Sequence, residues 1–253
     1  MSLRVVDMGN SCVKWAEAGT RGLGEVHRVC HDGDPASLLA HPAWLAAPPS
    51  RLVVICVAGE GMARALSRWA ETHWGVAPEF PASPSRGWGV VNGYRHHGRL
   101  GVDRWAALVA ARRRWPGRAL CLCDCGTALT VDVMDERGRH LGGAISAGLG
   151  TQRRALCAET AAIGGMTSPP VGGGDTPPFA DATEAAVGLG TLHALAGSVR
   201  HFRAQARRLL GRSPLCLITG GDAPALLPLL GRAYRHSPHL VLEGAALMAV
   251  APP

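Results

Sequence analysis

The stretch Leu3-Arg-Val-Val-Asp7-Met-Gly9-Asn10 decides the fold, because it has a second copy, Leu120-Cys-Leu-Cys-Asp124-Cys-Gly126-Thr127. In each copy an apolar strand runs into Asp, any residue, Gly and a small hydrogen-bonding residue. Further along each half, an apolar strand runs into Gly and a helix, first at Val53–Gly59 and then at Leu215–Gly221. A unit that occurs twice predicts a duplicated α/β fold with a cleft between its halves.

The rest of the chain alternates between apolar strands and helical stretches. In the first half we expect strands at 3–7, 13–18, 25–30 and 52–57, and helices at 35–46, 59–74 and 102–115. In the second half we expect strands at 120–124, 129–134, 140–145 and 215–219, and helices over much of 148–210, at 223–230 and at 243–250. Pro116-Gly117 ends a helix, so the predicted halves are residues 1–117 and 118–253. The Gly- and Pro-rich stretch Ser168–Pro178 is expected to be an exposed loop.

The composition is that of a folded, basic protein. With 47% apolar and 18% charged residues among 253, the chain can bury a full core. Its net charge of +7 suits an anionic partner, but 26 basic residues with Lys14 as the one lysine also fit a codon-composition bias. The start lacks the features of a signal peptide, and no apolar run approaches the roughly 18 residues of a membrane span. We therefore expect a cytoplasmic protein without a membrane partner.

The eight cysteines show no disulfide spacing, and we expect them to be small buried hydrophobes in a reducing compartment. Cys121, Cys123 and Cys125 alternate along one strand and share a face. This arrangement suits a soft metal, but no second Cys or His cluster completes such a site.

Each copy of the Asp-x-Gly-polar pattern forms a tight turn that suits a phosphate group. Glycine allows close approach, successive backbone N–H groups make an anion-binding concavity, and Asn10 or Thr127 adds a side-chain donor. Asp7 and Asp124 would hold cations that neutralise phosphate oxygens, and Lys14 lies within reach of the same phosphates. The alternative is an ordinary Asx turn with Lys14 as a solvated strand residue. The second copy favours phosphate binding.

Asp103 and Arg104 form the second candidate for chemistry. A carboxylate can accept the proton of a hydroxyl that is being phosphorylated, and a guanidinium can grip a carboxylate with two hydrogen bonds. The alternative is a charge pair at a helix N-terminus, where the helix dipole favours Asp.

These motifs together resemble a known family. Asp7-Met-Gly-Asn-Ser-Cys-Val-Lys14 resembles the D-x-G-N-[ST]-x-x-K phosphate motif of type III pantothenate kinases. This family includes Bvg accessory factor proteins and belongs to the acetate and sugar kinase/Hsp70/actin superfamily. The resemblance continues, in order along the chain, through Asn92–Tyr94, Leu100–Ala106, Asp124–Asp132, Gly142–Ile145, Thr219–Asp222 and Leu240–Gly244.

The resemblance implies two actin-like, ribonuclease H-like halves and the phosphorylation of pantothenate by ATP, the first step of coenzyme A biosynthesis. Mg²⁺ with ATP, and K⁺ or NH₄⁺, are the implied cofactors. It implies a homodimer in which Thr183 contacts the partner's pantothenate, with Asp103 as the base and Asp124 as the ligand of the monovalent cation. The implied ATP-binding residues are Asp7, Met8, Gly9, Asn10, Ser11, Cys12, Val13, Lys14 and Thr127. The implied substrate-binding residues are Tyr94, Gly101, Val102, Asp103, Arg104 and Thr183.

The chain departs from the family pattern at three places. His96-His97 replaces an acidic or amide residue and Pro, Ala147 replaces Pro, and Ala182 replaces Asn or Asp before Thr183. Asp175-Thr176 is a competing alignment for Thr183.

Two alternative functions remain open. One is a regulatory, Bvg accessory factor-like protein associated with DNA, and the other is a kinase for another small hydroxy acid. Nucleic acid is not expected, because the chain lacks helix-turn-helix and zinc-finger signatures and only Arg112–Arg114 forms a clear basic run.

Overall fold

The computed structural model describes residues 2–161 and 179–250 and divides into two compact units. The first unit contains the chain up to Gly117, residues 138–140 and the segment from His239 onward. The second contains residues 118–137 and 141–238. The predicted halves and the observed units both divide the chain after Gly117. The segment from His239, which we assigned to the second half, packs in the first unit. The stretch Ser168–Pro178, expected as a loop, lies outside the described residues.

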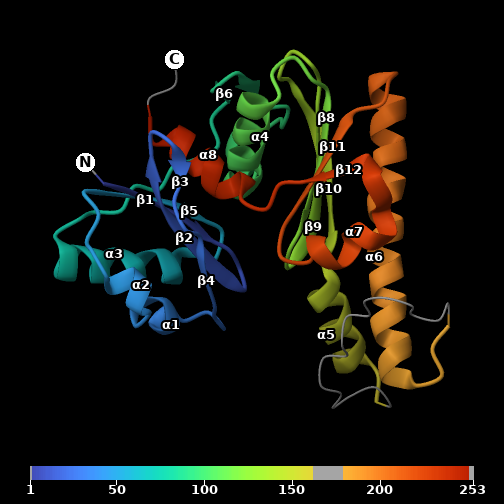
Figure 1. The fold of residues 1–253 in the computed structure, drawn as a ribbon, viewed down its shortest axis with the longest axis horizontal. Coiled ribbons are helices and arrows are strands. Elements are labelled where there is room, and N and C mark those ends of the chain that lie inside the picture. The colour runs from blue at the N-terminus through green and yellow to red at the C-terminus, as the bar shows by residue number, and fades with distance from the viewer. Residues whose placement is uncertain (1, 162–178, 251–253) are drawn as a thin grey trace. The chain divides into compact units, whose positions relative to one another are not determined.

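The first unit is built on a five-stranded sheet (Figure 1). Its strands are β1 (Leu3–Met8), β2 (Cys12–Gly19), β3 (Gly22–Leu23), β4 (His27–Cys30) and β5 (Arg51–Cys56). The order is β3-β2-β1-β5, and β4 also pairs with β2. β1 is antiparallel to β2 and parallel to β5. Leu52–Ile55 of β5 form a continuous apolar run, and Arg4–Met8 of β1 are all buried, which matches burial of the sheet on both faces.

Helices cover both faces of this sheet (Figure 1). One face carries α1 (Ala36–Leu39), α2 (Pro42–Leu45) and α3 (Glu60–Trp74), which enclose the fully buried Trp15 and Trp44. The single helix predicted over 35–46 is wrong, because Pro42 disfavours helical backbone at the residue before it. His41 accordingly has an extended ψ of 127° and caps α2 by accepting the N–H of Ala43.

The other face carries α4 (Val102–Arg114) and α8 (Leu240–Met248). These two helices approach closely at Gly244, where an added Cβ would lie 2.0 Å from the Ala106 carbonyl oxygen. Before α4 run the short strands β6 (Arg86–Gly87) and β7 (Val90–Val91) and the 3₁₀ turn η1 (His97–Arg99).

The second unit is also built on a five-stranded sheet, in the order β10-β9-β8-β11-β12. These strands are β8 (Leu120–Cys125), β9 (Ala128–Met134), β10 (His140–Ala147), β11 (Leu215–Thr219) and β12 (Tyr234–His236). The helices are α5 (Leu149–Glu159), α6 (Thr183–Leu210) and α7 (Ala223–Leu230), followed by the 3₁₀ turn η2 (Gly231–Ala233). Cys121, Cys123 and Cys125 are fully buried beneath α6 and α7, which confirms that they are core residues.

The two units repeat one arrangement of strands. Asp7 of β1 lies opposite Lys14 of antiparallel β2 and Ile55 of parallel β5. Asp124 of β8 lies opposite Thr130 of antiparallel β9 and Thr219 of parallel β11. The duplication predicted from the two motifs is therefore confirmed. Within the described residues, no helix combines the length and apolar character needed to cross a membrane.

Candidate active site

The turn that was predicted to bind phosphate, Asp7–Lys14, which we call the first phosphate turn, joins β1 to β2. Gly9 donates its backbone N–H to the Cys12 carbonyl at 3.1 Å, which closes the turn and leaves the Asn10 side chain exposed. A Cβ on Gly9 would lie 3.2 Å from that carbonyl oxygen, so glycine suits the tight turn. Lys14 returns opposite Asp7, with its Nζ atom 3.5 Å from the Asp7 Oδ2 atom. The turn thus presents a carboxylate, an ammonium group and backbone amides within eight residues.

Asp7 is buried, and two charged neighbours act on its pKa in opposite directions. Burial raises the pKa of the Asp7 carboxyl above its ordinary value, the Lys14 ammonium opposes this shift, and the Asp103 carboxylate adds to it. Asp103 is therefore close enough to Asp7 for their charges to interact. The fold brings together two acidic residues that are far apart in the sequence and that we assigned to phosphate binding and to catalysis.

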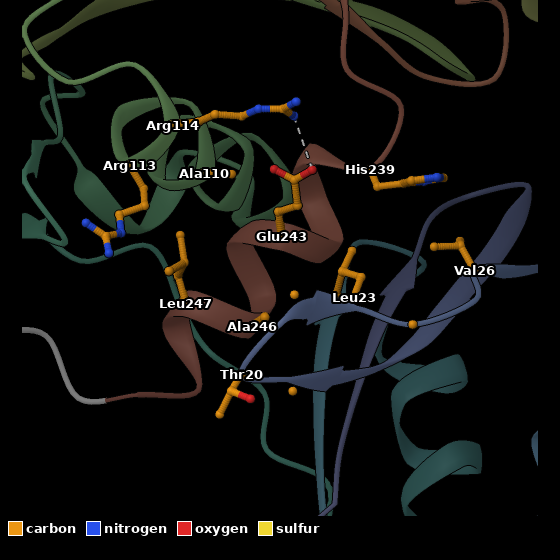
Figure 2. Close-up of a pocket in the computed structure, with 13 residues that line it drawn as sticks. Thr20, Leu23, Val26, Ala110, Arg113, Arg114, His239, Glu243, Ala246 and Leu247 are labelled. Carbon is orange, nitrogen blue, oxygen red and sulfur yellow. Dashed lines mark hydrogen bonds and ion pairs between the residues drawn. The ribbon is translucent and has the colours of Figure 1, made fainter.

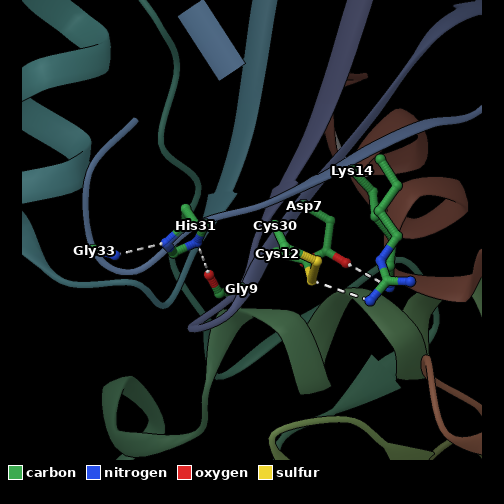
Figure 3. The surroundings of a disulfide bond; sticks show 8 residues. Asp7, Gly9, Cys12, Lys14, Cys30, His31 and Gly33 are labelled. Carbon is green, nitrogen blue, oxygen red and sulfur yellow. Dashed lines mark hydrogen bonds and ion pairs between the residues drawn. A yellow bond between two sulfur atoms is a disulfide. The ribbon is translucent and has the colours of Figure 1, made fainter. Parts of the chain in front are cut away.

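A disulfide joins the first phosphate turn to β4 (Figure 3). Cys12 at the start of β2 lies directly opposite Cys30 at the end of antiparallel β4, and their sulfur atoms are bonded. The expectation that all eight cysteines lack a disulfide partner is wrong for this pair. Antiparallel pairing brings the side chains of opposed residues together, and this pairing was not inferred from the sequence.

The segment predicted to bind substrate, Gly101–Arg104, lies at the N-terminus of α4. Asp103 lies in the first helical turn and accepts the backbone N–H of Arg104 on its Oδ1 atom at 2.8 Å. Gly101 precedes the helix, and a Cβ there would lie 2.5 Å from the same Oδ1 atom. A side chain at position 101 would therefore displace the Asp103 carboxylate, which explains why glycine is needed beside Asp103.

Arg104 is buried and held by Tyr94. The Arg104 Nη1 atom donates to the Tyr94 hydroxyl at 2.8 Å, and the guanidinium carbon lies 5.4 Å from the centre of the Tyr94 ring. The Tyr94 ring also stacks with His140, at 5.7 Å between ring centres. Asn92 fixes the loop by accepting the Tyr94 N–H and donating to the His97 carbonyl. The structure thus brings Tyr94 and Arg104 together, as expected for one substrate site, and adds His140, which the sequence gave no reason to include.

The turn Asp124–Thr127, also predicted to bind phosphate and called the second phosphate turn, lies between β8 and β9 and is enclosed by glycines. Gly126 donates its N–H to the Ala128 carbonyl at 3.1 Å. A Cβ on Gly148 would lie 1.9 Å from the Gly126 carbonyl oxygen, and one on Gly220 would lie 2.5 Å from Asp124 Oδ1. The Thr127 carbonyl accepts from the Gly148 N–H, and the Thr127 residue is exposed. Backbone therefore packs against backbone around this turn, as the Gly-rich sequence before α5 and α7 allows.

Asp222 is a second acidic residue beside Asp124, and it received no role from the sequence. Its backbone N–H donates to the Cys125 carbonyl, and its Oδ2 atom accepts the Leu149 N–H at 3.3 Å. Burial raises the pKa of the Cys125 thiol, and the Asp124 and Asp222 carboxylates raise it further, so both lie close to that thiol. The Thr219-Gly-Gly-Asp222 segment resembles the family pattern and could have pointed to Asp222, but the segment alone does not indicate a chemical role for it.

The donor chemistry of these turns fits magnesium-bound ATP. Asp7 and Asp124 offer carboxylate oxygens, and no group of three or more His, Cys, Asp or Glu suited to a metal occurs within residues 2–161 and 179–250. Mg²⁺ prefers oxygen ligands and commonly keeps waters and phosphate oxygens beside one or two carboxylates. The Asp7 and Asp124 carboxylates, each considered alone, suit a cation that arrives with the nucleotide.

Comparison with known proteins identifies the family. A family model described as type III pantothenate kinase matches residues 3–205. Type III pantothenate kinases of Nitrosococcus oceani and Alkalilimnicola ehrlichii are 36% and 37% identical to the chain. Each alignment covers 97% of this chain, and they cover 92% and 96% of those relatives. The chain belongs to the type III pantothenate kinase family.

Solved structures show the fold of this type III pantothenate kinase family member. A conserved putative Baf family transcriptional activator from Campylobacter jejuni has a TM-score of 0.58 at 16% identity, over 95% of this chain and 94% of that one. The activator of 2-hydroxyisocaproyl-CoA dehydratase from Clostridium difficile, with bound ADPNP, has a TM-score of 0.53 at 12% identity, over 98% and 94%. These likenesses show the actin-like fold alone.

Thr183, the residue that the family resemblance assigns to the partner's substrate, is exposed at the first position of α6. The preceding Ala182 is extended and makes no side-chain cap, so the replacement of Asn or Asp there leaves the helix start without that hydrogen bond. The competing alignment at Asp175-Thr176 lies outside the described residues. Of the remaining departures, His96 and His97 are exposed, and Ala147 ends β10.

A pocket of about 810 Å³ lies elsewhere in the first unit, where the β2–β3 hairpin meets α4 and α8 (Figure 2). Arg114 and Glu243 form an ion pair of 3.4 Å at its edge. None of the predicted site residues lines this pocket. It is therefore separate from the residues assigned to ATP and to substrate.

Proposed function

We propose that this chain transfers the γ-phosphoryl group of ATP to the hydroxyl of pantothenate, giving ADP and 4′-phosphopantothenate in the first step of coenzyme A biosynthesis. Membership of the type III pantothenate kinase family supports this activity. The observation that carries the assignment of residues is the interaction between Asp103 and Asp7, which joins the candidate base to the first phosphate turn.

Asp103 acts as the general base. Its carboxylate accepts the hydroxyl proton as the oxygen of pantothenate bonds to the γ-phosphorus, while the bond from that phosphorus to the bridging oxygen breaks and ADP leaves. The helix N-terminus and the Arg104 N–H hold the carboxylate in place through a bond of 2.8 Å. This restraint keeps one oxygen fixed and directs the other toward the substrate hydroxyl.

Arg104 binds the pantothenate carboxylate. A guanidinium has five N–H donors in a fixed plane, and Tyr94 accepts one of them while lying beneath the charge. Gly101 and Val102 provide the backbone that leads into this helical turn. Because the acid and the cation are consecutive residues, they set the distance between the hydroxyl and carboxylate ends of an acceptable substrate.

The turns Asp7–Lys14 and Asp124–Thr127 bind ATP. Backbone N–H groups and the Lys14 ammonium neutralise phosphate oxygens, and Asp7 would hold the Mg²⁺ that accompanies the nucleotide. When bound, this cation withdraws charge from the phosphate groups. Asp124 would be the ligand of K⁺ or NH₄⁺, with ADP release at varied K⁺ and Na⁺ as the measurement that tests it.

The active form is a cytoplasmic homodimer in which Thr183 contacts the substrate that is bound to the partner subunit. Mixed dimers test this arrangement, using Asp103→Asn and Thr183→Ala chains at low pantothenate concentration. If Thr183 acts across the interface, each mixed dimer contains one intact site, and random re-association restores about a quarter of the wild-type rate. If both residues act within one chain, the mixture is no more active than its parents.

The assay for the function itself is ADP release that depends on pantothenate, with Mg²⁺ and K⁺ or NH₄⁺ present. No pantothenate-dependent turnover would overturn the proposal. A panel of other small hydroxy acids, and a salt titration of DNA binding, test the two alternative functions in the same preparation.

A further inference from the structure

The end of β4 holds the first phosphate turn through a histidine as well as through the disulfide (Figure 3). The backbone N–H of His31 donates to the Ser11 carbonyl at 2.9 Å. The His31 Nε2 atom lies 2.9 Å from the Gly9 carbonyl oxygen. One residue, placed directly after β4, thus contacts two carbonyl groups of the turn.

The geometry around His31 fixes which ring nitrogen carries the proton. The backbone N–H of Gly33 donates to His31 Nδ1 at 3.1 Å, so Nδ1 is the acceptor. Nε2 must then carry the hydrogen that is donated to the Gly9 carbonyl. Gly33 has a φ of +106°, a conformation that glycine adopts without strain, and the turn at Gly33 directs its N–H back to the ring.

A hydrogen bond that fixes the direction of a carbonyl group also fixes the direction of the N–H of the next residue. A trans peptide group is planar, and its C=O and N–H point in opposite directions. Since His31 holds the Gly9 carbonyl on the β4 side, the Asn10 N–H faces away from β4. The same argument applies to Ser11, whose carbonyl accepts the His31 N–H, and to the Cys12 N–H that follows it.

We propose that His31 is a positioning residue for ATP. It acts through Gly9 and Ser11, keeping their carbonyl oxygens away from the nucleotide and directing the following N–H groups toward its phosphates. The proposal rests on the proposed role of Asp7–Lys14 as an ATP-binding segment. His31 belongs to neither repeat motif, and a loop histidine two residues before Gly33 carries no such signal in the sequence.

Three substitutions separate this role from a purely structural one. His31→Ala removes the ring, His31→Gln places an amide N–H near the former Nε2, and His31→Asn keeps only an acceptor near the former Nδ1. We expect His31→Ala and His31→Asn to raise the Kd and KM for ATP about 3- to 10-fold, as for one lost hydrogen bond. His31→Gln should restore most of this affinity. The KM for pantothenate should stay unchanged in all three variants.

His73→Ala is the matched control, because His73 also contacts a backbone carbonyl, that of Trp69, but on the exposed surface of α3. Nitrogen NMR of wild-type His31 should show the Nε2–H tautomer. Unchanged ATP affinity in His31→Ala, or rescue by Asn and not by Gln, would overturn the proposal. If His31→Ala does not fold, the comparison of the Gln and Asn variants decides.

Lys14→Ala distinguishes a failure of this inference from a failure of the proposed ATP site. If Lys14→Ala weakens ATP binding and the His31 variants do not, the positioning role is wrong and the ATP site stands. If neither Lys14→Ala nor the His31 variants change ATP affinity, the segment Asp7–Lys14 does not bind ATP, and both proposals are wrong.

Discussion

Replacing Asp103 by Asn removes the proposed base with little change of shape. The Asn Oδ1 atom can still accept the Arg104 N–H that lies 2.8 Å from the Asp103 oxygen, so the start of α4 should remain intact. General-base catalysis contributes about 10²- to 10⁴-fold to rate, and kcat should fall by that factor. The KM values for ATP and pantothenate should change little, because the lost interaction acts in the transition state.

The same substitution has a second, electrostatic consequence at Asp7. The Asp103 carboxylate helps to raise the pKa of Asp7, so its removal lowers that pKa. Asp7 is ionised above its pKa, and binding of magnesium-bound ATP should weaken as the pH falls through it. In Asp103→Asn, ATP binding should therefore persist to lower pH than in the wild type.

The assays are coupled ADP release for kcat and calorimetric ATP binding across the acidic range. Asp135→Asn is the control, because Asp135 also accepts a nearby backbone N–H, that of Arg137, away from the proposed site. A near wild-type kcat in Asp103→Asn would refute the assignment of the base. An unshifted pH dependence of ATP binding would contradict the prediction that Asp103 acts on ATP binding through the pKa of Asp7.

Three further substitutions test other features. Lys14→Arg replaces a compact ammonium by a planar group beside ATP and should raise the KM for ATP about tenfold, whereas normal kinetics would show that this lysine is dispensable. The Cβ of Gly148→Ala would lie 1.9 Å from a carbonyl oxygen of the second turn, so this change should lower the free energy of unfolding, measured in urea, by about 1–3 kcal/mol. In the control Gly190→Ala, the added Cβ would have nothing within 4 Å, and the free energy of unfolding should stay unchanged or rise. The double change Cys12→Ser/Cys30→Ser should lower the free energy of unfolding by about 3 kcal/mol, as expected for a disulfide that spans 18 residues. An unchanged unfolding midpoint would contradict the disulfide.

Local patterns predicted the strands of the two five-stranded sheets other than β3 and β12, and the tight turns proposed to bind phosphate, because these features depend on neighbouring residues. In the sequence, Asp7 and Asp124 can each be recognised by the glycine that follows two residues later. By contrast, the bond between Cys12 and Cys30 depends on the register of two strands, which no short motif encodes. His31 is similar, because its importance comes from the turn that β4 meets and not from its own neighbours.

The place of α8 in the first unit was not predicted, for a related reason. Each half of the sequence has its own strands and helices, so a division after Gly117 is complete at the level of secondary structure. Only packing shows that α8 covers the sheet of the first unit beside α4. The small residues Gly244 and Ala106 make that contact possible, but the sequence of either helix alone does not indicate that the two residues pack together.

The position of α8 also sets an order of assembly during synthesis. The ribosome makes the strands of the first unit, then the whole second unit, and only afterwards the helix that covers the first sheet. The second unit can thus finish folding while the first still exposes the apolar face that α8 will cover. The first phosphate turn and the Asp103 segment, although made early, belong to the part of the protein that is completed last.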